Sequence, residues 1–343
     1  DRKNFFTSSY RLESWLASSG NTEGISVDWI DRYINPRNIN LMNYDDIMSL
    51  PNITPLDANA IMEQKERENI EGYFQLKNSP GISNYGYRSL IPFIDFDSTR
   101  TNEFHLRFSS LIRTTPIITN PDSEQRGTSN YSDKPEQFHK ISSYYTFGKY
   151  QSTIKFGMSY KQQMGQSNNI YTSKNFLEFK DIPLIGNIFR IDEFIIGNFT
   201  AVFGQGVVFE NTDHFTPRRS GYGFTKRNDG IHSDLTSTSQ YVLDGAAIQL
   251  SSKLLRFSYF RSENPRDAII NSDLDSFTSL IVMQPRSPWG INANQEKIYS
   301  NLVSSVTERT MGWNIRLGKA SNYIGFTFYR SLYDKYIIPQ PVE

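Results

Sequence analysis

Residues 139–161 read as two short amphipathic strands joined by a tight polar turn. In each strand, apolar and aromatic residues alternate with polar or small ones, which is the period of a β-strand with one apolar face. On a helix, the same apolar residues would scatter around the circumference. The residues that share one face of the second strand are Ile154, Phe156, Met158 and Tyr160. With its polar turn at 148–151, this stretch predicts a β-hairpin.

The composition suits a sheet whose two faces differ in polarity. Hydrophobic residues make up only 37% of the 343 residues, yet aromatic residues make up 14%. Such a mixture is typical of a membrane barrel with a polar lumen and aromatic girdles, and a soluble β-rich domain is the alternative. Basic and acidic residues both total 36, so no overall charge attracts nucleic acid or anionic lipid. The absence of cysteine excludes disulfides and thiolate sites.

The two-residue period continues to the end of the chain. It predicts about nine strands, many of them near the ~10 residues that cross a bilayer as a tilted β-strand. No apolar run approaches the ~20 residues of a membrane-spanning helix. The predicted strands lie near residues 104–112, 138–147, 152–161, 175–182, 189–208, 241–251, 254–264, 309–317 and 323–332.

The connectors between these segments alternate strictly between long and short. Outer-membrane barrels have this loop pattern, with short turns on the periplasmic side and long loops outside. If the first strand starts in the periplasm, residues 1–96 are periplasmic as well. A closed single-chain bacterial barrel has an even number of strands, so the odd number means either that one strand has been missed or, as we favour, that this sequence stops before its barrel closes.

Residues 39–96 carry helical signals instead. Asn43 is placed to cap a helix that ends before Pro51, and Pro55 is placed at the start of a second helix. The expected inner face of that second helix consists of Leu56, Ala60 and Ile61. A second turn at residues 80–82 precedes another helix. Two helix–hairpin–helix units in tandem are the simplest interpretation.

This segment resembles the tandem helix-hairpin-helix domain of competence DNA receptors. The resemblance rests on LPNITPLDANAI followed by SPGISNYGYRSLIPFI. In that family the hairpin amides bind DNA phosphate, and the glycines of the hairpin permit close backbone approach. The corresponding hairpin positions here are Asn52, Ile53, Thr54, Gly81, Ile82 and Ser83.

Two departures weaken the DNA-binding interpretation of this domain. Three of the four hairpin glycines are missing, and residues 39–94 contain 4 basic against 7 acidic residues, a net charge of −3. Such a module repels a polyanion unless its cations gather at the hairpins. Protein docking or a structural role is therefore the alternative to DNA contact.

A second resemblance covers most of the chain. Residues 195–250 are similar to the barrel part of a group of Gram-negative outer-membrane proteins that join an N-terminal helix-hairpin-helix domain to a β-barrel. The landmarks are the stretches FGQG, RRSGYG and DGAA. The resemblance implies an α+β multidomain protein: a helical segment at 1–38, a tandem helix-hairpin-helix domain at 39–96 and an antiparallel transmembrane β-barrel at 97–343.

No enzyme constellation, cofactor motif or metal site stands out. The four histidines lie in separate segments without metal-ligand spacing. The pairs Asp45–Asp46 and Asp192–Glu193 resemble common surface features, and the glycines at 204 and 206 predict a bulge or close packing. One basic cluster is a candidate for lining a pore or gripping an anion or nucleic-acid strand, with a solvated loop as the alternative. It consists of Arg218, Arg219, Lys226 and Arg227.

Three functional hypotheses follow. The first is an outer-membrane barrel, embedded in outer-membrane lipid, that passes a solute or polymer such as DNA. The second is a non-catalytic scaffold or docking subunit that contacts other envelope proteins through its helical domain. The third is a soluble DNA-binding protein, which requires another layer to cover the outward apolar faces of the strands.

Overall fold

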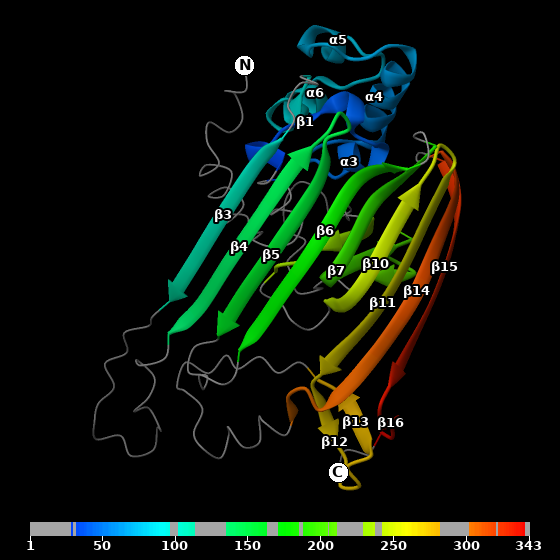
Figure 1. Ribbon diagram of the computed structural model, residues 1–343. Helices are drawn as coiled ribbons and strands as arrows, with labels where there is room; N and C mark the ends of the chain where they lie inside the picture. Colours follow the sequence, from blue (N-terminus) through cyan, green and yellow to red (C-terminus); the bar gives the residue numbers. More distant parts are fainter. Residues whose placement is uncertain are drawn as a thin grey trace.

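The structure is a computed structural model, and it shows a group of short helices above one end of a large, tilted β-sheet (Figure 1). In the described part of the chain, no helix combines the length and the apolar character needed to cross a membrane. The described residues are 29, 32–96, 102–113, 135–162, 171–184, 188–204, 206–210, 229–236, 242–281, 302–319 and 322–339.

Residues 32–96, together with Trp29, form the part that we call the helical unit. Its α-helices are α3 (Tyr44–Met48), α4 (Pro55–Arg67), α5 (Tyr73–Lys77) and α6 (Asn84–Leu90). Its 3-10 helices are η2 (Ile39–Leu41) and η3 (Ile91–Phe93), and its two-residue strands β1 (Arg37–Asn38) and β2 (Ile94–Asp95) pair in parallel. Helices α3 and α4 both begin with capping boxes, at Asn43 and Thr54, as their sequences predict.

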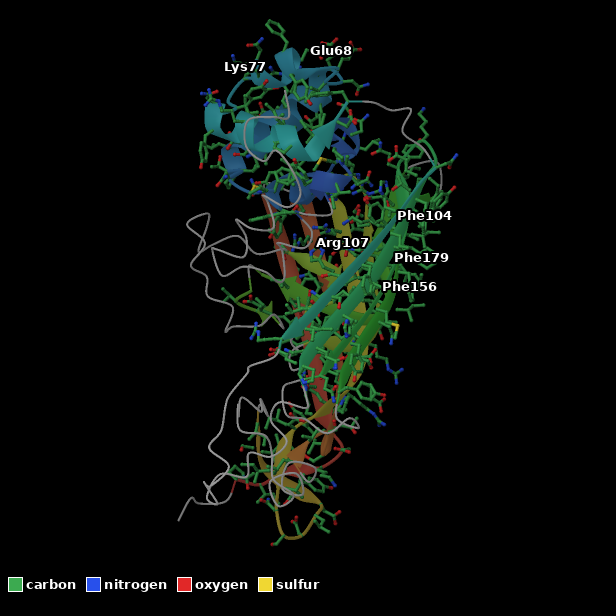
Figure 2. The ribbon with its side chains drawn as sticks, turned by 90° about the vertical axis from the view of Figure 1, so that its left-hand side faces the viewer. Glu68, Lys77, Phe104, Arg107, Phe156 and Phe179 are labelled. Atoms are coloured by element: carbon green, nitrogen blue, oxygen red, sulfur yellow. The ribbon has the colours of Figure 1, made fainter. Side chains whose placement is uncertain are left out.

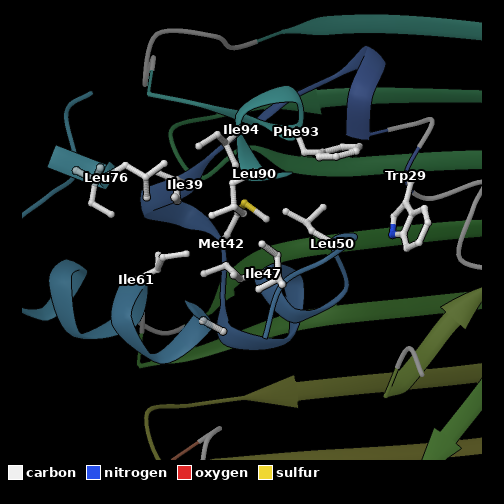
Figure 3. Packing of buried hydrophobic residues seen from close by; sticks show 13 residues of the cluster. Trp29, Ile39, Met42, Ile47, Leu50, Ile61, Leu76, Leu90, Phe93 and Ile94 are labelled. Carbon is white, nitrogen blue, oxygen red and sulfur yellow. The ribbon is translucent and has the colours of Figure 1, made fainter. Parts of the chain in front are cut away.

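The core of the helical unit is formed entirely by its own residues (Figure 3). The buried side chains are Trp29, Ile39, Met42, Ile47, Leu50, Ile53, Ala58, Ile61, Ile70, Leu76, Leu90, Phe93 and Ile94. The expected inner face of α4 was partly wrong: Ala60 and Ile61 are buried, but Leu56 is 75% exposed. Leu56 lies in the first turn of α4 but outside its buried side, which consists of Asp57, Ala58, Ala60 and Ile61.

The large sheet contains the nine predicted strands in one antiparallel path, β15-β14-β11-β10-β7-β6-β5-β4-β3. This confirms the two-residue periodicity as the dominant structural signal after residue 102. The strands are β3 (Glu103–Arg113), β4 (Glu136–Phe147), β5 (Ser152–Gln162), β6 (Thr172–Leu184), β7 (Phe189–Phe203), β10 (Leu243–Ser251), β11 (Leu255–Arg266), β14 (Val306–Lys319) and β15 (Asn322–Tyr333).

The sheet is open in the described part of the chain. Its path ends at β3 on one side and at β15 on the other, and the registers include no pairing between these two strands. Eight antiparallel pairings separate the first strand from the ninth, so β3 and β15 run in the same direction, away from the helices (Figure 1). These nine strands therefore do not form a closed barrel, and the barrel predicted from the sequence was itself an incomplete one.

One face of the sheet, which we call the outer face, carries an unbroken apolar row across all nine strands. The other, which we call the inner face, carries a polar row one residue away. The outer row is Phe104, Tyr145, Ile154, Phe179, Phe194, Ile248, Tyr259, Trp313 and Phe328. The inner row is Glu103, Thr146, Thr153, Lys180, Glu193, Gln249, Ser258, Asn314 and Thr327.

The exposure of side chains on the two faces is the reverse of that in a water-soluble sheet. On the outer face, Phe104 and Leu106 are 64% and 66% exposed, whereas on the inner face Gln249 and Ser258 are 2% and 0% exposed. Figure 2 shows Phe104, Phe156 and Phe179 on one side of the strands and Arg107 on the other. Water-soluble domains bury apolar side chains and expose polar ones. This sheet instead exposes apolar side chains on its outer face and buries polar ones on its inner face.

The end of β7 folds back against the inner face. The sequence predicted a strand over 189–208, but β7 ends at Phe203, and Gly204 and Gly206 adopt positive φ angles of 62° and 74° in a turn rather than a bulge. The turn leads into β8 (Phe209–Glu210), and both β8 and β9 (Gly230–Ser233) pair with β7. The second core of the protein forms here. It comprises Phe176, Ile195, Phe199, Ala201, Phe203, Ile231, Leu243, Ala247 and Phe260.

A small sheet lies at the other end of the long strands, away from the helical unit (Figure 1). It consists of β12 (Ala268–Ile270), β13 (Ser276–Leu280) and β16 (Tyr336–Ile337). Its buried side chains are Ala268, Phe277 and Val306. The small sheet and the helical unit thus occupy opposite ends of the large sheet.

Candidate functional site

The two predicted hairpins have similar backbone geometry. Asn52 and Gly81 have φ angles of 59° and 94°, the left-handed conformation that glycine adopts without strain. After each turn a hydroxyl side chain caps the next helix: Thr54 accepts from the amide of Asp57, and Ser83 accepts from the amide of Gly86. The missing first-hairpin glycine is therefore replaced by asparagine, a residue that also tolerates this conformation.

Asp57 joins the two hairpins. Its carboxylate accepts from the backbone amide of Thr54 at 3.0 Å and from the backbone amide of Ser83 at 2.7 Å. Burial alone would raise the pKa of Asp57, but the hydrogen bonds from Thr54 and Ser83 outweigh it and lower that pKa below its ordinary value. Hairpin amides of the kind that bind phosphate in the DNA-receptor family thus already donate to an internal anion.

The remaining hairpin positions divide between core and surface. Ile53 is buried and Ile82 packs against the core of the helical unit, so both act as apolar anchors. Thr54, Gly81 and Ser83 are exposed. Asp57 therefore links the two predicted hairpins, and the backbone amides of Thr54 and Ser83 are both occupied by its carboxylate.

The predicted basic cluster of Arg218, Arg219, Lys226 and Arg227 lies outside the described residues. The residue that follows it in the described chain, Asp229, forms an ion pair with Arg316 of β14. This pair lies on the helical-unit side of the sheet, because Asp229 also lines the cavity described next.

Between the helical unit and the short-turn end of the sheet lies a cavity of about 180 Å³. Residues from α3 and β1 face residues from seven long strands across it, namely β3, β4, β5, β6, β7, β10 and β11. The short connectors of the sheet are on this side, next to the helices (Figure 1). The charged residues that line the cavity and take part in the ion pairs described below include Arg37, Asp46, Lys180, Asp181, Asp192 and Arg256.

Arg37 connects the helical unit to the sheet. One guanidinium nitrogen lies 3.2 Å from Asp46 in α3, and the other lies 2.5 Å from Asp181 at the end of β6. Arg32 also pairs with Asp46, at 3.3 Å. The neighbouring Asn38 donates its backbone amide to the Gln151 side chain at 3.2 Å, so β1 is held against the turn between β4 and β5.

The ion pairs continue along the sheet and return to the helices. Arg190 pairs with Asp181 at 3.5 Å and with Asp192 at 2.7 Å. Arg256 lies 3.5 Å from Asp192 and forms an ion pair with Asp45 of α3. Because Asp45 precedes Asp46 in α3, the contacts close a ring of alternating charges, which we call the ion-pair ring. Its members are Arg37, Asp46, Asp45, Arg256, Asp192, Arg190 and Asp181.

The ring strongly favours the charged form of Asp46. Burial alone would raise the pKa of this carboxyl, but the positive charges of Arg37, Lys180 and Arg32 outweigh burial and hold the pKa well below its ordinary value. A second group of charges lies beside the ring on the inner face, where Glu193 pairs with Lys180 at 2.9 Å and with His232 at 3.2 Å. The acidic side chains described here in the cavity wall are thus paired with basic ones.

This arrangement holds elements together and presents no catalytic constellation. In the described ranges, no group of three or more His, Cys, Asp or Glu side chains is placed to hold a metal ion. Of the described histidines, His105 pairs with Glu103 and His139 contacts Ser110, both on the sheet. The chemistry that the site offers is reversible ion pairing between two parts of one chain.

Sequence reasoning missed this site. It treated Asp45–Asp46 and Asp192–Glu193 as surface features, whereas Asp46, Asp192 and Glu193 are buried. Their partners are far apart in the sequence, and nothing local marks Arg37 or Arg256 as a bridge. One signal was available in the sequence. The acidic pair Asp192–Glu193 closely follows a predicted short turn, and the predicted topology places that turn on the same side of the sheet as the helical domain.

Comparisons with models of protein families, with curated proteins and with solved structures give no match. Function is therefore argued from the sheet, the hairpins and the ion-pair ring.

Proposed function

We propose that this protein is an outer-membrane β-barrel protein of a Gram-negative bacterium that acts as a non-catalytic docking subunit. In this proposal, residues 39–96 are a tandem helix-hairpin-helix domain on the periplasmic side. The observation that carries the proposal is the reversed polarity of the nine-stranded sheet, apolar outside and polar inside.

The outer face supports contact with lipid. A contiguous exposed apolar surface larger than a few hundred Å² marks a membrane or protein contact in a folded chain. Here the apolar row crosses nine strands without a charged residue. Strands of 9 to 15 residues, alternating apolar-out and polar-in, match what a bilayer requires of a transmembrane barrel.

The position of the helical unit supports the orientation. It contacts the sheet at the short-turn end, and short turns are periplasmic in outer-membrane barrels. Strand direction also constrains closure: β3 and β15 are parallel, so an all-antiparallel barrel needs an odd number of further strands between them. We infer that the complete barrel has an even number of strands.

The hairpins support docking rather than DNA uptake. The Ser83 amide is engaged by Asp57, and the module from 39 to 94 is acidic, with 4 basic and 7 acidic residues. Counterion release from DNA needs several cations at the phosphate contacts. An acidic domain with exposed Leu56 and Tyr85 beside its hairpins suits contact with another envelope protein better than contact with a polyanion.

Membrane insertion is tested by reconstituting the full chain into liposomes and washing them with alkaline carbonate. We expect the protein to stay with the vesicles through flotation and to be released only by detergent. Release into the aqueous wash would contradict the barrel and favour the soluble alternative.

The choice between docking and DNA handling is tested by titrating the reconstituted protein with duplex DNA at about 50 mM salt, where phosphate contacts are strong. We expect no saturable binding. Binding that weakens steeply with salt and is lost in Gly81→Asp would instead assign the hairpins to DNA.

A further inference from the structure

The helical unit is a self-contained body that meets the sheet through polar contacts. Among the described residues, every member of its apolar core, and every side chain packed against that core, comes from residues 29–96. The recorded contacts with the sheet are ion pairs and hydrogen bonds, through Arg37, Asn38 and Asp45. A fourth pair, Lys319 with Glu66 at 3.9 Å, is exposed. Interfaces without an apolar core are characteristic of parts that separate.

Buried ion pairs contribute little net free energy to the stability of such an interface. The attraction within the ion-pair ring is offset by the loss of hydration of each charge, and separation returns that hydration. Three buried polar atoms at the cavity, Arg37 Nε, Glu193 Oε2 and Asp229 Oδ1, also lack a hydrogen-bond partner. Unsatisfied buried groups raise the free energy of the docked arrangement relative to one in which water reaches them.

The helical unit covers strand ends that would become accessible if it separated from the sheet. Its α3 and β1 cover Gln151 at the β4–β5 turn and face the charged ends of β6, β7 and β11. In a barrel, these strand ends form the rim of the periplasmic mouth. We propose that the helical unit is a releasable cap on that mouth, held by the ion-pair ring and able to leave as an intact folded body. This proposal rests on the barrel proposed above.

Release is measured by thiol labelling, because the chain has no native cysteine. Gln151→Cys places a thiol at a position that is 6% exposed beneath Asn38, and Ser89→Cys places one at a position that is 3% exposed inside the helical unit. Each is made in the full chain, reconstituted into liposomes, and treated with a water-soluble maleimide. The first thiol reports cap release, and the second reports unfolding of the unit.

Charge reversal then breaks the ring. Asp45→Arg places two positive charges against each other at Arg256, whereas Asp45→Asn removes the ion pair without adding a charge. We expect Asp45→Arg to speed labelling of Gln151→Cys by at least about tenfold, the equivalent of 1.4 kcal/mol, and Asp45→Asn to speed it less. Labelling of Ser89→Cys stays slow throughout. The control Arg67→Glu changes an exposed charge on the same unit and leaves both rates unchanged.

The outcomes separate this inference from the proposed function. Failure of the chain to remain in liposomes overturns the barrel. If the protein is inserted and Asp45→Arg leaves the Gln151→Cys rate unchanged, the cap is a fixed part of the barrel and the inference is wrong. If both thiols speed up together, the unit unfolds rather than releases, and the inference is equally wrong.

Discussion

The side chain of Asp57 forms hydrogen bonds to both hairpins of the helical unit. Its carboxylate, 1% exposed, completes the capping box of α4 and also accepts from the Ser83 amide in the second hairpin. The two hairpins are thereby tied together by a buried acid. The same residue stabilises the fold and occupies two backbone donors at the start of α4 and α6.

Replacing Asp57 with alanine removes the cap and leaves a partly buried amide without its acceptor. We expect Asp57→Ala to lower the local stability of α4 and α6 by about 2–3 kcal/mol. Hydrogen exchange of the full chain in detergent micelles measures this loss, with Asp57→Asn, which keeps one acceptor oxygen, as the milder control. Unchanged exchange in α6 would show that the Ser83 contact contributes nothing.

Among the elements, β7 carries a strong steric constraint at one glycine. Gly197 has a φ of 106°, and a Cβ there would lie 2.2 Å from the carbonyl oxygen of Asn175 on β6. Gly325 on β15 has ordinary space, with its nearest neighbour at 3.5 Å. A side chain is therefore sterically opposed at Gly197 and accommodated at Gly325.

We expect Gly197→Ala to destabilise the sheet by about 3 kcal/mol or more, because backbone strain and a clash add together. Gly325→Ala serves as the matched control and is expected to stay within about 1 kcal/mol of the parent. Urea unfolding in lipid vesicles compares the two. Equal stability of both variants would contradict the pairing of β6 with β7.

The faces of β3 allow a second test at the level of elements. Leu106 lies on the outer face and His105 on the inner face, one residue apart. Arginine at a lipid-facing position near the bilayer midplane costs about 2–4 kcal/mol, and an inward position tolerates it. We therefore expect Leu106→Arg to reduce folding into vesicles far more than His105→Arg. The reverse order would mean that the inner and outer faces have been exchanged.

At the scale of the whole molecule, the ion-pair ring makes docking of the helical unit sensitive to acid. The pKa of Asp46 is lower in the folded protein than its ordinary value, so the unfolded or undocked chain binds the proton more readily. The stabilisation from Asp46 is complete above its unfolded pKa of about 3.9 and is lost progressively as the pH falls from that value toward the lower folded pKa.

We expect hydrogen exchange at β1 and α3, corrected for intrinsic rates, to accelerate between about pH 5 and pH 3. Asp46→Asn should exchange faster at pH 7 and show a flatter dependence on pH. The control Asp273→Asn, in the small sheet at the opposite end, alters a carboxyl whose pKa is also lowered but which does not contact the ring. Acid sensitivity that persists in Asp46→Asn would assign it to another group.

Local chemistry determined much of this protein by itself. Alternation of side chains specified nine strands and their apolar faces, and capping residues such as Asn43 and Thr54 specified where helices begin, because both signals act within a few residues. Only the tertiary structure decided that β7 turns back at Gly204, that Leu56 faces solvent, and that Asp45, Asp192 and Arg256 meet. Those outcomes depend on contacts between residues far apart in the chain, and nothing in a residue's own neighbourhood encodes the charge that will face it after folding.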